Sequence, residues 1–149
     1  MRITALATTL LVSVACLSAA CADADNYDGG TIQVIADEAG ASTLMLYISN
    51  QSFEDNNVRI EVRLDGRALI ARQFAVGNQH NWIPHSVTLD AGTHTLTATS
   101  DTGVNHSATF EIADAQTRYA VLDYWYYPND PSAPRNFSFT VQDDPVGFD

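Results

Sequence analysis

Hydrophobic and polar residues alternate with a period of two over most of the chain after residue 30, and no segment sustains the 3.6-residue period of an amphipathic helix. Stretches rich in β-branched and aromatic residues are separated by short clusters of turn-forming residues. The predicted strands are residues 31–36, 43–49, 57–64, 67–76, 81–89, 93–100, 104–112, 118–127 and 135–142. This pattern predicts an all-β fold, namely a two-sheet antiparallel sandwich of eight or nine strands.

Asp65-Gly66 separates two of these strands, and this dipeptide favours the two-residue turn whose twist suits a β-hairpin. The strand before it should bury Val58, Ile60, Val62 and Leu64. Its partner loses clean alternation, so we expect a β-bulge near residues 71–73.

A second hairpin is predicted over residues 93–112, with Asp101-Thr102-Gly103 at its tip. A three-residue loop with Gly103 at positive φ gives the register that keeps apolar residues inside. Leu96 then pairs with Ala108 and His94 with Phe110 on the inner face. The outer face becomes a ladder of threonine and serine. A flat threonine face can bind ice or glycans, but we favour the alternative that the ladder stabilises an exposed β surface.

The segment Leu89-Asp90-Ala91-Gly92-Thr93-His94-Thr95-Leu96 resembles the loop and strand of bacterial immunoglobulin-like and PEGA-type surface modules. This resemblance implies an immunoglobulin-like sandwich. It also implies a structural role for His94.

The first residues have the parts of an export signal: Arg2, an apolar stretch, and small residues before Cys21. The segment Leu17-Ser18-Ala19-Ala20-Cys21 resembles the signal of bacterial lipoproteins, in which the cysteine is acylated. The sequence therefore predicts a signal peptide over residues 1–20, a lipid-anchored tether over 21–30 and the sandwich over 31–149. The expected location is the cell envelope, with lipid anchoring in the outer membrane. Ordinary cleavage, which would release a soluble periplasmic or extracellular protein, is the alternative.

The chain carries a formal net charge of -11 and contains arginine but no lysine. Such an acidic chain is poorly suited to binding DNA or RNA, because phosphate binding requires clusters of basic residues. The expected partners are the membrane, through the lipid anchor, and an envelope protein or glycan.

An aromatic run, Tyr124-Trp125-Tyr126-Tyr127, ends one predicted strand. Alternation sends Trp125 to one face of the sheet and Tyr124 and Tyr126 to the other. We favour packing of Trp125 in the core with tyrosine hydroxyls at the rim. The alternative is a carbohydrate- or calcium-dependent binding module, in which Trp82, Tyr124, Trp125 and Tyr126 form a platform for a sugar or an aromatic partner.

Metal and catalytic chemistry have weaker support in the sequence. Asp123, Asn129 and Asp130 supply the oxygen ligands that calcium prefers, and Asp143-Asp144 is a second candidate. A zinc site from His80 and His85 with an aspartate is a minor alternative. No cofactor is expected other than this optional calcium. Because the sequence lacks the common nucleophile and phosphate-loop motifs, we predict a non-catalytic binding or structural role.

Overall fold

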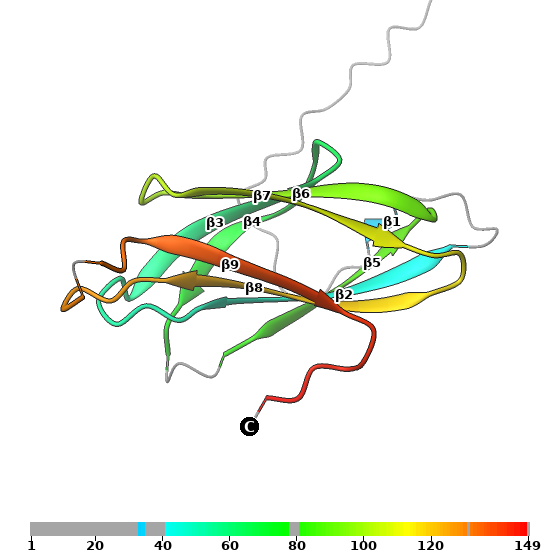
Figure 1. The fold of residues 1–149 in the computed structure, drawn as a ribbon. Helices are drawn as coiled ribbons and strands as arrows, with labels where there is room; N and C mark the ends of the chain where they lie inside the picture. The colour runs from blue at the N-terminus through cyan, green and yellow to red at the C-terminus, as the bar shows by residue number, and fades with distance from the viewer. Residues whose placement is uncertain (1–32, 35–40, 78–80, 131, 149) are drawn as a thin grey trace, which may run out of the picture.

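The structure is a computed structural model that describes residues 33–34, 41–77, 81–130 and 132–148. Its strands form two sheets packed face to face (Figure 1). The five-stranded sheet has the order β1-β5-β2-β8-β9 and the four-stranded sheet the order β4-β3-β6-β7. The strands are β1 (Gln33–Val34), β2 (Ser42–Asn50), β3 (Asn57–Leu64), β4 (Arg67–Ala75), β5 (Ile83–Leu89), β6 (Gly92–Ser100), β7 (Asn105–Ile112), β8 (Thr117–Trp125) and β9 (Asn136–Gln142).

The predicted all-β sandwich is confirmed. One feature of the pairing differs from expectation: the five-stranded sheet is mixed, because β2 runs parallel to β8 and β1 runs parallel to β5. The four-stranded sheet is antiparallel throughout. Parallel pairing of β2 with β8 joins strands far apart in the sequence, and alternation within each strand carries no information about that direction.

The core lies between the sheets and is formed by alternate residues of each strand. On β3 these are Val58, Ile60, Val62 and Leu64, all fully buried as predicted. On β2 and β8 the inward positions include Leu44, Leu46, Ile48, Leu122 and Tyr124. Burial of this apolar surface is the main stabilising contribution in a sandwich of this size.

Both predicted hairpins are present. Asp65 and Gly66 have φ values of 49° and 78°, which is the left-handed pair that a type I′ turn requires. In the second hairpin Leu96 pairs with Ala108 and His94 with Phe110, and Gly103 has a φ of 87°. The register deduced from burial therefore holds.

The bulge in the first hairpin was predicted in the wrong place. Val62 pairs with Ile70 and Arg63 with Ala68, so Leu69 is the extra residue, next to the turn instead of near residues 71–73. Because of this bulge, Leu69 and Ile70 are both buried although they are consecutive.

Among the described residues, no helix is long and apolar enough to cross a bilayer. Cys21 and the predicted signal and tether lie outside the described residues.

Candidate functional site

The outer side of the five-stranded sheet carries a group of aromatic rings around one carboxylate. β2 and β8 lie side by side in parallel register, so Tyr47 neighbours Val121 and Ser49 neighbours Asp123. These positions alternate with the buried residues of both strands and therefore point away from the core. We call this surface the aromatic face; its residues are Tyr47, Phe53, Trp82, Asp123, Trp125, Tyr127 and Phe148.

Asp123 is the polar centre of the aromatic face. Its Oδ1 accepts hydrogen bonds from the Ser49 hydroxyl at 2.6 Å and from the Trp82 indole at 2.9 Å. The Gln51 side-chain amide donates to Ser49 at 2.9 Å, and Ser49 and Gln51 are both buried. Within the described part of the chain, Asp123 Oδ2 accepts no hydrogen bond. The carboxylate is thus held in one orientation with an acceptor atom to spare.

Burial raises the pKa of Asp123, and the hydrogen bonds from Ser49 and Trp82 offset only part of that effect. A carboxylate that is partly withdrawn from water forms stronger hydrogen bonds with whatever donor it meets. Asp123 is therefore suited to accept a hydrogen bond from a ligand hydroxyl.

Three rings pack in a row beside Asp123, and we call this row the Trp125 stack. Trp125 and Tyr127 lie nearly parallel, with ring centroids 5.7 Å apart and an interplanar angle of 15°. Phe53 packs on Tyr127 with centroids 4.7 Å apart and is tilted by 35° relative to it, and 60% of Phe53 is exposed. The Trp125 indole donates to the Ser138 hydroxyl of β9 at 2.8 Å, which fixes the orientation of the ring.

The backbone explains why Phe53 reaches this stack. Past Asn50, the chain continues to pair with β8, because Gln51 N–H donates to the Tyr124 carbonyl at 2.8 Å and Phe53 N–H to the Tyr126 carbonyl at 3.0 Å. Residues 51 and 53 therefore keep the outward parity of Ser49. This pairing places the Phe53 ring next to Tyr127, just past the end of β8.

A second aromatic group lies on the other side of Asp123, toward β5. Trp82 precedes β5, and its indole reaches Asp123 on β8. Phe148, from the C-terminal segment, stacks on Trp82 with centroids 4.2 Å apart and an interplanar angle of 19°. Its ring also meets Tyr47 edge to face at 5.1 Å.

Tyr124 and Tyr126 point to the opposite side of β8. Tyr124 is fully buried, so its ring cannot serve as part of an exposed platform, and that part of the alternative prediction is wrong. The favoured placement of Trp125 in the core is also wrong, because Trp125 bonds to Ser138 on the outer side. Asp123 shares the parity of Trp125, and this charge was the sequence signal that the tryptophan faces outward.

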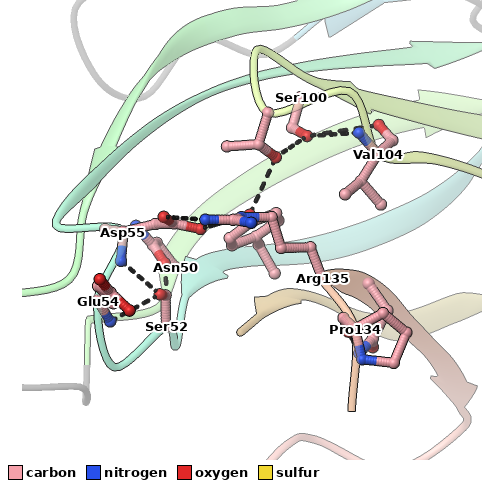
Figure 2. A network of polar contacts seen from close by, with 11 residues as sticks. Asn50, Ser52, Glu54, Asp55, Ser100, Val104, Pro134 and Arg135 are labelled. Atoms are coloured by element: carbon pink, nitrogen blue, oxygen red, sulfur yellow. Dashed lines mark hydrogen bonds and ion pairs between the residues drawn. The ribbon is translucent and has the colours of Figure 1, made fainter. Parts of the chain in front are cut away.

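A polar network around Asp55 and Arg135 lies at one end of the sandwich (Figure 2), and the Tyr124 hydroxyl belongs to it. This hydroxyl donates to Asp55 Oδ2 at 2.8 Å and lies 2.9 Å from the Thr102 hydroxyl. Arg135 makes two hydrogen bonds to Asp55, at 2.8 and 3.0 Å. Its guanidinium also lies 3.8 Å from the centre of the Tyr126 ring. Three loops are thereby fastened together.

The pKa values in this network follow from these contacts. The hydrogen bonds from Arg135 and Tyr124 hold the pKa of Asp55 below its usual value despite partial burial. Burial, with the neighbouring Asp55 carboxylate, raises the pKa of Tyr124 to about 12. Because its members already bind one another, the network is structural.

Three of the aspartates predicted as calcium ligands make other contacts. Asp123 Oδ1 holds Ser49 and Trp82, and Asp130 caps its own turn by accepting from Ser132 N–H at 2.9 Å. Asn129 is exposed in the same turn. Asp143 pairs with Arg118 at 3.0 Å. In the described part of the chain, no three His, Cys, Asp or Glu residues converge as a metal site. Calcium binding stays a prediction.

Two of the histidines, His94 and His85, are buried in the fold. His94 contacts Asp65 at 2.7 Å and the Asp90 carbonyl at 2.9 Å through its two ring nitrogens. His85 is buried between the sheets, and burial together with the charge of Arg72 lowers its pKa to about 4. His80 lies outside the described residues, so the minor zinc prediction is not tested.

Sequence reasoning proposed Trp82 and Trp125 as ligand-binding residues and Asp123 as a calcium ligand, and it did not include the other four residues of the aromatic face. Tyr127 is two residues beyond Trp125, and that spacing alone places it on the same side. Phe53, Tyr47 and Phe148 meet their partners through the parallel pairing of β2 with β8 and the course of the C-terminal segment. No protein-family model matches this chain, and no curated protein is similar to it.

Proposed function

We propose that this chain is an exported, lipid-anchored module of the cell envelope that binds a neutral saccharide on the aromatic face and catalyses no reaction. The observation that carries the proposal is the stack of Trp125, Tyr127 and Phe53, partly exposed beside Asp123. Aromatic rings held in a fixed orientation provide large contact areas at small cost in conformational entropy.

The chemistry of the face matches that of a sugar. The flat C–H side of a pyranose ring can pack on an indole or phenol ring, and its hydroxyls require acceptors at the edge. Asp123 Oδ2 supplies such an acceptor next to the rings. The net charge of -11 disfavours anionic ligands, so a neutral saccharide fits better than an acidic one.

Intrinsic fluorescence tests this proposal, because both tryptophans of the chain belong to the aromatic face. The tetrasaccharides of β-1,4-linked N-acetylglucosamine and of β-1,4-linked glucose are titrated separately into the protein. We expect a saturable change in emission with at least one of them, and its loss in Trp125→Ala. Thr97→Ala, on the four-stranded sheet, is the matched control. Absence of saturable binding by both sugars would contradict the proposal.

The lipid anchor requires its own experiment. The support for it is the sequence around Cys21, which resembles a lipoprotein signal. Intact mass of the protein from the membrane fraction should show cleavage before Cys21 and an added diacylglyceryl group, both lost in Cys21→Ala. An unmodified mass in the soluble exported fraction would refute the anchor and leave the binding proposal intact.

A further inference from the structure

The C-terminal segment crosses the aromatic face and places one ring on it. After β9, the chain turns back along the side of the five-stranded sheet that faces away from the other sheet (Figure 1). Gln142 stabilises the turn by donating to the carbonyls of Asp144 and Pro145 at 2.8 and 3.4 Å. Phe148 then lies flat on Trp82.

This contact is unlike those of the core aromatic residues. Tyr124 and Phe137 are 0% and 7% exposed and pack between the sheets. Phe148 is 39% exposed and touches rings of the outer face. The apolar area that its contact removes from water is therefore small, and the segment can leave without opening the core.

Phe148 also covers a surface that has the features of a binding site. Phe148 lies nearly parallel to the Trp82 indole and meets the Tyr47 ring edge to face, so these two rings bound it on two sides. The same indole donates to Asp123, so the carboxylate lies at the edge of this ring as well. A sugar ring in this place would contact the same two aromatic rings as Phe148. Its hydroxyls could also donate a hydrogen bond to Asp123, which the Phe148 ring cannot do.

We propose that Trp82, Tyr47 and Asp123 form a second saccharide subsite, and that Phe148 fills this subsite until a ligand displaces it. This inference rests on the proposed function and extends the site from the Trp125 stack, past Asp123, toward β5. Two subsites on opposite sides of one carboxylate suit a ligand of several sugar units. The ligand therefore competes with the chain's own C-terminal ring for one of them.

The expected size of the competition follows from the contact. A stacked aromatic pair contributes about 0.5–1.5 kcal/mol beyond area burial. The apparent affinity falls by the fraction of molecules in which the subsite is open, so removing the Phe148 ring should tighten binding about two- to tenfold.

Isothermal titration calorimetry with the two tetrasaccharides named above tests the inference on the full domain. We compare the unaltered protein with Phe148→Ala, which removes the ring, and with Phe148→Tyr, which keeps it. Asp144→Ala is the matched control, because it changes an exposed side chain of the same segment without touching the rings. The expected result is two- to tenfold tighter binding in Phe148→Ala alone, and loss of that gain when Trp82→Ala is added.

The outcomes separate the two proposals. Equal affinities in the unaltered protein and Phe148→Ala would overturn the second subsite and leave the Trp125 stack as the binding site. Equal gains in Phe148→Ala and Asp144→Ala would also overturn it, because the effect would then come from loosening the segment and not from freeing a ring. Failure of all variants to bind either sugar would overturn the proposed function and this inference with it.

Discussion

The outer faces of the two sheets differ in chemistry although both belong to the same sandwich. The four-stranded sheet shows short hydroxyl side chains on β6 and β7, with Thr97 opposite Ser107 and Thr95 opposite Thr109. We call this the hydroxyl face. The five-stranded sheet shows large rings around a partly buried carboxylate. Packing of the core requires neither pattern, so the difference points to separate roles for the two surfaces.

The two sides of the five-stranded sheet differ most clearly at β8, where the consecutive residues Tyr124 and Trp125 point in opposite directions. Tyr124 faces inward, fills the core and fastens the end of the sandwich through Asp55. Trp125 faces outward and is held by Ser138. A shift of one residue along β8 therefore separates a ring that packs in the core from a ring that lies on the outer face.

The largest expected effect comes from removing the inward ring. Tyr124→Ala should lower the free energy of unfolding by ~3–5 kcal/mol, the range for deleting a large buried aromatic side chain. Trp125→Ala should cost less, about 1–3 kcal/mol, because it loses a partly exposed aromatic contact and one hydrogen bond. Urea denaturation of both variants measures this. Equal losses would mean that Trp125 is as much a core residue as Tyr124.

The second effect concerns binding. Trp125→Ala should weaken binding of the tetrasaccharide by at least about 2 kcal/mol, or roughly 30-fold, as expected for a central aromatic anchor. Thr97→Ala, on the hydroxyl face, should change the affinity by less than about twofold. Calorimetric titration of the two variants compares the faces directly. A greater loss for the threonine variant would reverse the assignment.

The third effect is a pH dependence of opposite sign at two carboxylates. Burial raises the folded-state pKa of Asp123, so the folded chain takes up this proton before the unfolded chain does. The contribution of Asp123 to stability therefore improves as the pH falls from the raised pKa toward the unfolded value of about 3.9. In Asp123→Asn this improvement is absent.

Asp65 supplies the comparison at the end of the four-stranded sheet. Burial raises its pKa, but hydrogen bonds from His94 and from Thr95 N–H outweigh that effect, and the pKa is lowered overall. Its contribution is complete above the unfolded pKa of about 3.9 and is lost as the pH falls through the lower folded value. Urea unfolding of Asp123→Asn and Asp65→Asn, each against the unaltered protein from pH 7 to pH 2, should give trends of opposite sign. Parallel trends would contradict the assignment.

The smallest effect is expected on the hydroxyl face. Thr97→Val keeps a β-branched side chain in an exposed strand and should change the free energy of unfolding by no more than ~0.5 kcal/mol. Thermal and urea unfolding measure this change. A loss of several kcal/mol would show that the hydroxyl ladder is a main source of stability.

The sequence predicted local structure well because each local feature has a local cause. Asp65-Gly66 specifies its own turn, and the need to bury Leu96 and Phe110 fixed the register around Gly103. All nine predicted strands have a counterpart, although β1 is described only at Gln33–Val34. The bulge was predicted in the wrong place because strand alternation does not allow for two consecutive buried residues. Leu69 and Ile70 are both buried, and only the strand pairing shows that Leu69 is the extra residue.

The aromatic face is formed by contacts between separate segments of the chain, and the alternation of polar and apolar residues within one strand does not predict such contacts. Trp82 meets Asp123 only because β5, β2 and β8 are neighbours in that order. Phe53 joins Tyr127 through parallel pairing, and Phe148 reaches Trp82 through a segment with no strand pattern. The sequence therefore drew attention to Trp82, Asp123 and Trp125, but only the fold shows that they lie together on one face.

The most direct test of the central claim, that the aromatic face binds and the hydroxyl face does not, is a titration followed by ¹H–¹⁵N correlation spectra. The ligand is the tetrasaccharide of N-acetylglucosamine or that of glucose. The indole N–H signals of Trp82 and Trp125 should shift together and saturate, while the amide signals of Thr95 and Thr97 should not move. Saturable shifts confined to the Thr95 and Thr97 strand, or no shift of either indole at millimolar sugar, would contradict this claim.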